Sequence, residues 1–149
     1  MDLNALYNQI IVENSRAPQN RRRVEGATVS LEGVNPSCGD DIVLELRVKD
    51  GVIEDAGFVG DGCAISQASA SLMVDLVSGR TVEEARDLLH LFFGMIKGEI
   101  TDEARLEKLE DAVALQGVSH MPARVKCAVL AWHTLEEALD GRQPETVRL

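Results

Sequence analysis

The chain has 149 residues, 45% of them hydrophobic and only 3% aromatic, which fits one globular domain over residues 1–149 with an aliphatic core. Its formal net charge of -10 excludes a typical nucleic-acid binder, which would be basic, and favours a partner with a basic face. No apolar run is long enough to span a bilayer, and the first residues lack the pattern of a signal peptide, so we expect no membrane contact and a cytoplasmic protein.

The N-terminal segment predicts an amphipathic helix over residues 2–15, because Leu3, Leu6 and Ile10 recur at helical spacing. Pro18 ends this pattern. Residues 19–26 are polar and irregular and contain three consecutive arginines. We expect a solvated loop there, with a docking patch for an acidic surface as the alternative.

Three strands are expected next, over residues 27–34, 42–48 and 52–59, because apolar and polar residues alternate in each. Asp50-Gly51 separates the second and third runs, and Asp-Gly between alternating runs is a strong hairpin signal. The three strands therefore predict an antiparallel sheet.

The period changes after residue 63, and helices are expected over residues 64–77, from Thr81 to near Gly98, over 102–116 and from Pro122 to Leu139. Thr81 and Glu84 form the pattern of a capping box at the second of these helices. Strands followed by helices predict the fold class α+β: a single domain in which helices pack on a three-stranded antiparallel sheet.

The three cysteines, Cys38, Cys63 and Cys127, each lie at or near the edge of an expected element. An odd number of cysteines in a reducing compartment does not suggest a disulfide framework, so metal binding or thiol chemistry becomes the better explanation. Soft ligands far apart in sequence form one site only if the fold brings them together.

A fourth ligand is available next to the first cysteine, because Asp40 lies two residues after Cys38 with a glycine between them. Cys63 opens a helix, where the helix dipole favours a thiolate, and Arg124 lies one turn before Cys127 on the same face. Three thiolates and a carboxylate fill a tetrahedral site, which zinc usually occupies. Spacing alone leaves open the alternative of three unrelated thiols.

The histidines are weaker candidates. His90 lies between two leucines of a helix, and His133 lies two turns beyond Cys127. His120, just before the last helix, is the best placed of the three, but we expect none of them to be a ligand.

Three motifs together resemble the IscU/NifU-like iron–sulfur scaffold family over nearly the whole chain: Pro36–Asp40, Gly60–Ser66 and Arg124–Cys127. Within the family the chain is most similar to the SufU branch. Typical IscU scaffolds carry histidine where this chain has Lys126, and they lack the extra helical sequence found here within residues 84–117.

The resemblance implies zinc bound by Cys38, Asp40, Cys63 and Cys127. It also implies a sulfurtransferase that accepts persulfide sulfur on Cys38 from a PLP-dependent cysteine desulfurase of the SufS type. Downstream iron–sulfur assembly proteins would then receive the sulfur. Arg124 is expected to assist by stabilising thiolate charge or by helping Cys38 to leave the metal.

Two other functions remain open at this point. The same cysteines could hold a transient [2Fe–2S] cluster on a scaffold, because such clusters are bound by thiolates. The chain could also be an inert, zinc-stabilised adaptor that activates the desulfurase by docking. Lys126 in place of histidine favours sulfur transfer over scaffolding.

Overall fold

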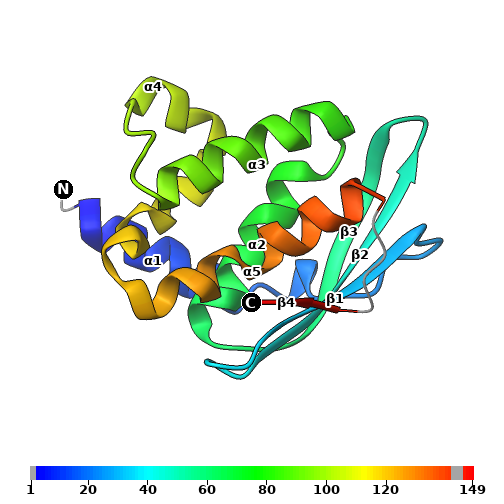
Figure 1. The fold of residues 1–149 in the computed structure, drawn as a ribbon, viewed down its shortest axis with the longest axis horizontal. Helices are drawn as coiled ribbons and strands as arrows, with labels where there is room; N and C mark the ends of the chain where they lie inside the picture. Colours follow the sequence, from blue (N-terminus) through cyan, green and yellow to red (C-terminus); the bar gives the residue numbers. More distant parts are fainter. Residues whose placement is uncertain (1–2, 142–145) are drawn as a thin grey trace.

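The protein is described here by a computed structural model that covers residues 3–141 and 146–149, with helices packed against a sheet (Figure 1). Its elements in chain order are the helix α1 (Leu3–Ser15), the 3₁₀ turn η1 (Pro18–Asn20), the strands β1 (Val29–Asn35), β2 (Asp40–Lys49) and β3 (Val52–Asp61), the helices α2 (Ala64–Val77), α3 (Val82–Ile96) and α4 (Glu103–Leu106), the 3₁₀ segment η2 (Glu107–His120), the helix α5 (Pro122–Leu139) and the strand β4 (Thr146–Arg148).

The α+β prediction is confirmed, but the sheet has four strands in the order β3-β2-β1-β4 rather than the three expected. The added strand β4 pairs in parallel with β1, and the Thr146 hydroxyl donates to the Glu32 carboxylate over 2.9 Å. A three-residue strand is too short for an alternating pattern, so only its tertiary pairing defines it.

The predicted hairpin turn and capping box are both present. Asp50 and Gly51 form the hairpin turn between β2 and β3 with φ of 53° and 76°, and both halves of the capping box between Thr81 and Glu84 are present. The helix expected over 102–116 is different: after the single turn α4 the chain continues as 3₁₀ structure. Glu110 interrupts it with φ 51° and ψ -130°.

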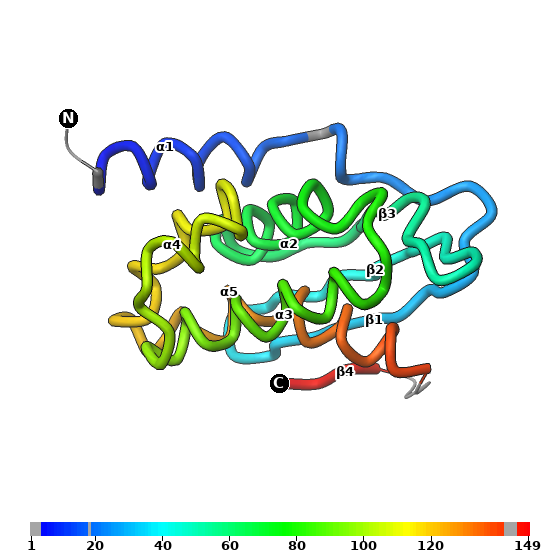
Figure 2. Tube along the Cα trace, turned by 90° about the horizontal axis from the view of Figure 1, so that it is seen from above, coloured from blue at the N-terminus to red at the C-terminus, as the bar shows by residue number. Residues whose placement is uncertain are grey.

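One face of the sheet is covered by α2 and α5, and α3 lies outside α5 (Figure 2). The aromatic rings of Phe92 and Trp132 stack at 3.9 Å between centroids in the buried core. Helix α5 lies so close to β1 at Gly33 that a Cβ on this glycine would be 2.2 Å from the Thr134 hydroxyl oxygen. This approach brings the start of α5, with Cys127, over the end of β1.

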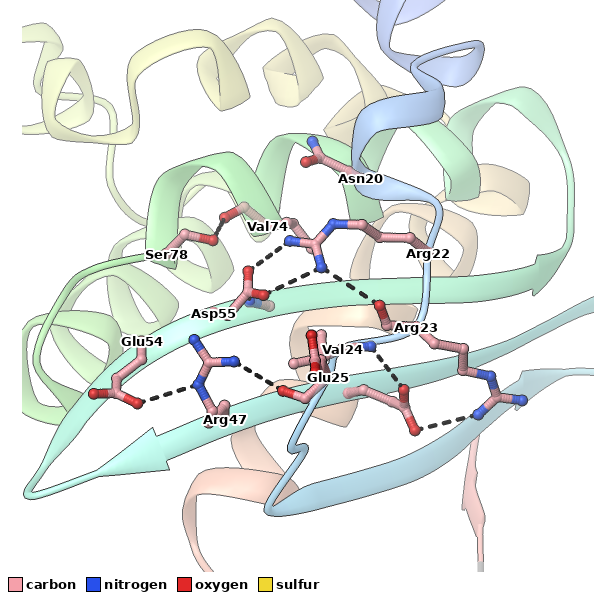
Figure 3. A network of polar contacts seen from close by, with 12 residues as sticks. Asn20, Arg22, Arg23, Val24, Glu25, Arg47, Glu54, Asp55, Val74 and Ser78 are labelled. Carbon is pink, nitrogen blue, oxygen red and sulfur yellow. Dashed lines mark hydrogen bonds and ion pairs between the residues drawn. The ribbon is translucent and has the colours of Figure 1, made fainter.

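The opposite face of the sheet carries the arginine-rich stretch, as Figure 3 shows. The Arg22 guanidinium makes two hydrogen bonds to Asp55, of 2.6 and 3.1 Å. Glu45 accepts the backbone N–H of Val24 at 3.0 Å and a hydrogen bond from Arg23 at 3.2 Å. The arginines are solvent-exposed, as expected, but two of them anchor this segment to the chain's own sheet.

Within the described residues, no helix combines the length and the apolar character that crossing a membrane requires.

Candidate metal centre

Cys38 lies near the tip of the connection between β1 and β2. Asn35 and Asp40 are the last paired residues of these strands, and residues 36–39 form the connection above them. The Cys38 N–H donates to the Asn35 carbonyl at 3.2 Å. Gly39 adopts φ of 70°, a left-handed conformation that glycine accepts without strain. The pair of strands therefore presents a half-buried thiol on a short loop with a fixed base.

Asp40 is almost fully buried, and its carboxylate is held from several sides. Its Oδ1 accepts the Cys63 N–H at 2.9 Å and the Ser66 hydroxyl at 3.1 Å, and its Oδ2 accepts the Asn35 side-chain amide at 3.3 Å. A buried carboxylate is costly unless such donors compensate for the lost water. These donors orient Asp40 before any ligand binds.

Cys127 is fully buried at the start of α5, and its Sγ lies 3.0 Å from the Sγ of Cys38. Both thiols are free rather than disulfide-bonded. Burial raises the pKa of the Cys127 thiol, and the neighbouring thiols of Cys38 and Cys63 raise it further. Ligand atoms of Cys38, Asp40 and Cys127 all lie within 4.8 Å of one another, so the fold brings together three of the four predicted ligands.

Cys63 borders this group without belonging to it. Its backbone N–H holds Asp40, while its thiol accepts the Ser66 N–H at 3.4 Å and so caps the N-terminus of α2. The thiol is nevertheless close enough to Cys127 to affect the pKa of that residue. Cys63 as a fourth ligand therefore stays a prediction.

Arg124 lies beside the thiols on the exposed first turn of α5. Its pKa is raised by a hydrogen bond to Cys127, and the nearby Cys63 and Cys38 act in the same direction. A guanidinium in this position favours negative charge on sulfur. The assisting role of Arg124 stays a prediction.

The histidines lie outside the group of close ligand atoms among the described residues. His90 and His120 are exposed, and the His133 ring stacks on Phe93 with 4.4 Å between centroids.

The donor set fits zinc. Two sulfurs and a carboxylate oxygen within 4.8 Å approach the separation of roughly 3–4 Å between ligands of a tetrahedral zinc ion, and Cys63 is adjacent as a further sulfur. Sequence reasoning missed Asn35 and Ser66, whose side chains donate hydrogen bonds to the Asp40 carboxylate. The hydrogen bonds of both side chains join residues far apart in the chain or on different strands, so no local pattern predicts them.

Comparison with known proteins identifies the family of this chain. A model of the "NifU-like N terminal domain" matches residues 6–91. The chain belongs to the NifU-like family. Its similarity to iron–sulfur assembly scaffolds extends over the full fold: this NifU-like chain resembles the SUF-system scaffold protein of Fervidobacterium islandicum with a TM-score of 0.82 and 35% identity, over 91% of this chain and 98% of the other.

Two curated relatives carry different functional names. The iron–sulfur cluster assembly scaffold protein IscU of Thermotoga maritima is 46% identical over 90% of this NifU-like chain and 92% of its own length. The zinc-dependent sulfurtransferase SufU of Bacillus subtilis is 39% identical over 93% and 92%. The names of the Thermotoga maritima and Fervidobacterium islandicum proteins refer to iron–sulfur cluster assembly, whereas the name of the Bacillus subtilis relative refers to zinc and to sulfur transfer.

Proposed function

We propose that this protein is a zinc-dependent sulfurtransferase that accepts persulfide sulfur from a PLP-dependent cysteine desulfurase of the SufS type. The observation that carries the proposal is the position of Cys38: its half-buried thiol lies near the tip of a loop against Asp40 and the fully buried Cys127. The relative named zinc-dependent sulfurtransferase supports the same function. Downstream iron–sulfur assembly proteins would receive the sulfur.

The zinc ion would be held by Cys38, Asp40, Cys63 and Cys127. When bound, it keeps the coordinating thiols deprotonated at neutral pH. Burial raises the pKa of the Cys127 thiol, and a bound metal ion would offset that effect. Asp40, already oriented by its donors, supplies an oxygen ligand.

Sulfur transfer is then a thiol exchange on Cys38. The Cys38 thiolate attacks the outer sulfur of the desulfurase persulfide and forms a new S–S bond. The bond between the outer sulfur and the desulfurase cysteine breaks, and that cysteine leaves as a thiolate with the bonding electrons. No net oxidation or reduction occurs, and Cys38 becomes the persulfide.

Arg124 assists this exchange through its charge. Its guanidinium lies on the exposed side of the thiol group, so it can stabilise the Cys38 thiolate when that residue moves toward a partner. It holds no proton that the reaction requires. An Arg124→Lys variant keeps the charge and is therefore expected to retain more transfer than Arg124→Ala.

The direct test incubates the purified protein with a cysteine desulfurase and free cysteine, followed by mass spectrometry of the intact chain without reductant. One added sulfur atom, located on Cys38 by peptide mapping and absent from Cys38→Ala, is the expected result. If the protein were an adaptor that acts by docking alone, the Cys38→Ala variant would still raise desulfurase turnover. Activation by this variant would therefore contradict sulfur transfer.

A second function, the scaffold for a [2Fe–2S] cluster, is favoured by the name of the Thermotoga maritima relative. Protein purified without oxygen separates the two. About one zinc ion per chain without acid-labile sulfide supports the transferase. Iron with matching sulfide would make the scaffold the better function.

A further inference from the structure

The loop that carries Cys38 has a fixed base. One buried side chain at that base, Asn35, also contacts helix α5. Asn35 ends β1 and Asp40 begins β2, and their Cα atoms are partners across the hairpin. Asn35 is fully buried. Its side-chain amide donates to Asp40 Oδ2 at 3.3 Å and contacts Cys127 Sγ at 3.7 Å.

The other half of the same amide is unsatisfied. Asn35 Oδ1 is buried and has no hydrogen-bond partner among the residues that the structure describes. A buried polar atom without a partner costs free energy, and an apolar side chain would avoid that cost. A packing role alone does not account for asparagine here, whereas its two N–H donors meet two of the predicted metal ligands.

We propose that Asn35 is a positioning residue that holds Asp40 and Cys127 together independently of Cys38. The inference rests on the proposed function, because it takes these residues as zinc ligands. If Cys38 left a bound zinc ion to accept sulfur, the loop tip would be free to move while Asn35 still linked β1, β2 and α5. The remaining ligands would then keep hold of the metal.

The neutrality of the amide matters as much as its donors. Three thiolates, one carboxylate and Zn²⁺ already carry two net negative charges, so a carboxylate at position 35 would add a third in a buried position. Asn35→Asp keeps the shape of the side chain, adds that charge and removes the donors. Asn35→Ala removes the donors without adding charge.

Zinc affinity, measured by competition with a chromophoric chelator, tests the proposal without any activity assay. Outer residues that hydrogen-bond metal ligands typically contribute 10–100-fold to metal affinity, and we expect a loss of about that size in Asn35→Ala and a larger one in Asn35→Asp. Asn20→Ala is the matched control, since Asn20 is also buried but donates to Ser71 and Asp75. Its zinc affinity should equal that of the wild type.

The Cys38→Ala background decides how Asn35 acts. If Asn35 holds the base of the site, Asn35→Ala should weaken zinc binding by the same factor in the Cys38→Ala protein as in the wild type. Wild-type zinc affinity in Asn35→Ala, or a loss that vanishes once Cys38 is removed, would overturn the proposal. Should either substitution at position 35 prevent folding, as judged by thermal unfolding of the metal-free protein, Asn35→Ser is measured and interpreted in the same way.

The same measurements separate this inference from the proposed function. A wild-type protein that binds zinc but accepts no sulfur would contradict the transferase and leave the affinity test of Asn35 intact. A wild-type protein that binds no zinc would overturn both.

Discussion

The sulfur atoms of Cys38 and Cys127 lie 3.0 Å apart, although the two residues are 89 positions apart in the sequence. One belongs to a hairpin connection, and the other is a buried residue of α5. Their separation is short enough for a metal to bridge them and, when no metal does so, short enough for covalent bonding after a small movement.

Mild oxidation of the metal-free protein should therefore produce an intramolecular disulfide between Cys38 and Cys127. The sulfurs need to approach to about 2 Å, and the short loop around Gly39 permits that movement. Peptide mapping after treatment with diamide identifies the bond. Zinc should protect against it and Cys63→Ser should still form it; a Cys38–Cys63 disulfide as the main product would contradict the observed geometry.

Replacement of Gly62 by alanine should weaken zinc binding. A Cβ at this position would lie 2.3 Å from the Ser66 hydroxyl oxygen and 2.8 Å from Asp40 Oδ1, so both side chains must move. We expect an affinity loss of about 10-fold by chelator competition, as for other changes that displace a residue behind a metal ligand. Gly117→Ala is the control, since a Cβ there meets nothing within 4 Å, and equal affinities in the two variants would sink the prediction.

Acidification should destabilise the metal-free protein partly through Glu45. The backbone N–H of Val24 and, to a smaller extent, Arg23 lower the pKa of the Glu45 carboxyl. A lowered folded-state pKa stabilises the fold above the usual glutamate pKa of about 4.5 and loses that contribution as the pH falls further. Urea unfolding between pH 6 and pH 3.5 should therefore be less pH-dependent in Glu45→Gln than in the wild type.

At pH 6 the Glu45→Gln variant should also lose roughly 1 kcal/mol of unfolding free energy, the scale of a typical intramolecular hydrogen bond. Glu54→Gln is the control. Glu54 makes an exposed ion pair with Arg47, and its replacement should change the unfolding free energy by less than about 0.5 kcal/mol. Parallel pH profiles for wild type and Glu45→Gln would disprove the assignment.

Loss of the capping box should destabilise the fold without touching the metal centre. Thr81→Ala removes the hydroxyl that accepts the Glu84 N–H at 3.1 Å, and N-cap replacements of this kind cost about 1 kcal/mol. Chemical unfolding of the metal-free protein measures the change, with the exposed Thr101→Ala as control. Zinc affinity should stay at the wild-type value, and a reduced affinity would mean that α3 supports the site.

The sequence was most informative where a local signal sets the boundary. Helix α2 spans residues 64–77 as predicted, because Cys63 caps its start and Ser78 ends it. The Asp50-Gly51 turn likewise sets the β2–β3 hairpin. Cys38, Asp40 and Cys127 were found from residue type and motif, since each brings a metal-ligating atom to the edge of an element.

The features that the sequence did not indicate depend on partners far along the chain. The strand β4 is defined by its pairing with β1. The kink at Glu110 interrupts the expected helix, although no glycine or proline at that position predicts a break. Asn35 reads locally as a turn residue before a proline. Its contact with Cys127 joins positions 92 apart, and no periodicity contains that information.

The sulfur of Cys63 has a consequence for spectroscopy. In the absence of metal it is the hydrogen-bond partner of the Ser66 N–H at the first turn of α2. Coordination would turn the thiol into a metal-bound thiolate, and the strength of its hydrogen bond to that amide would change. The chemical shift and hydrogen-exchange rate of the Ser66 amide would therefore report whether Cys63 coordinates a metal ion. The first turn of α2 thus offers a measure of metal binding that requires no label at the cysteines.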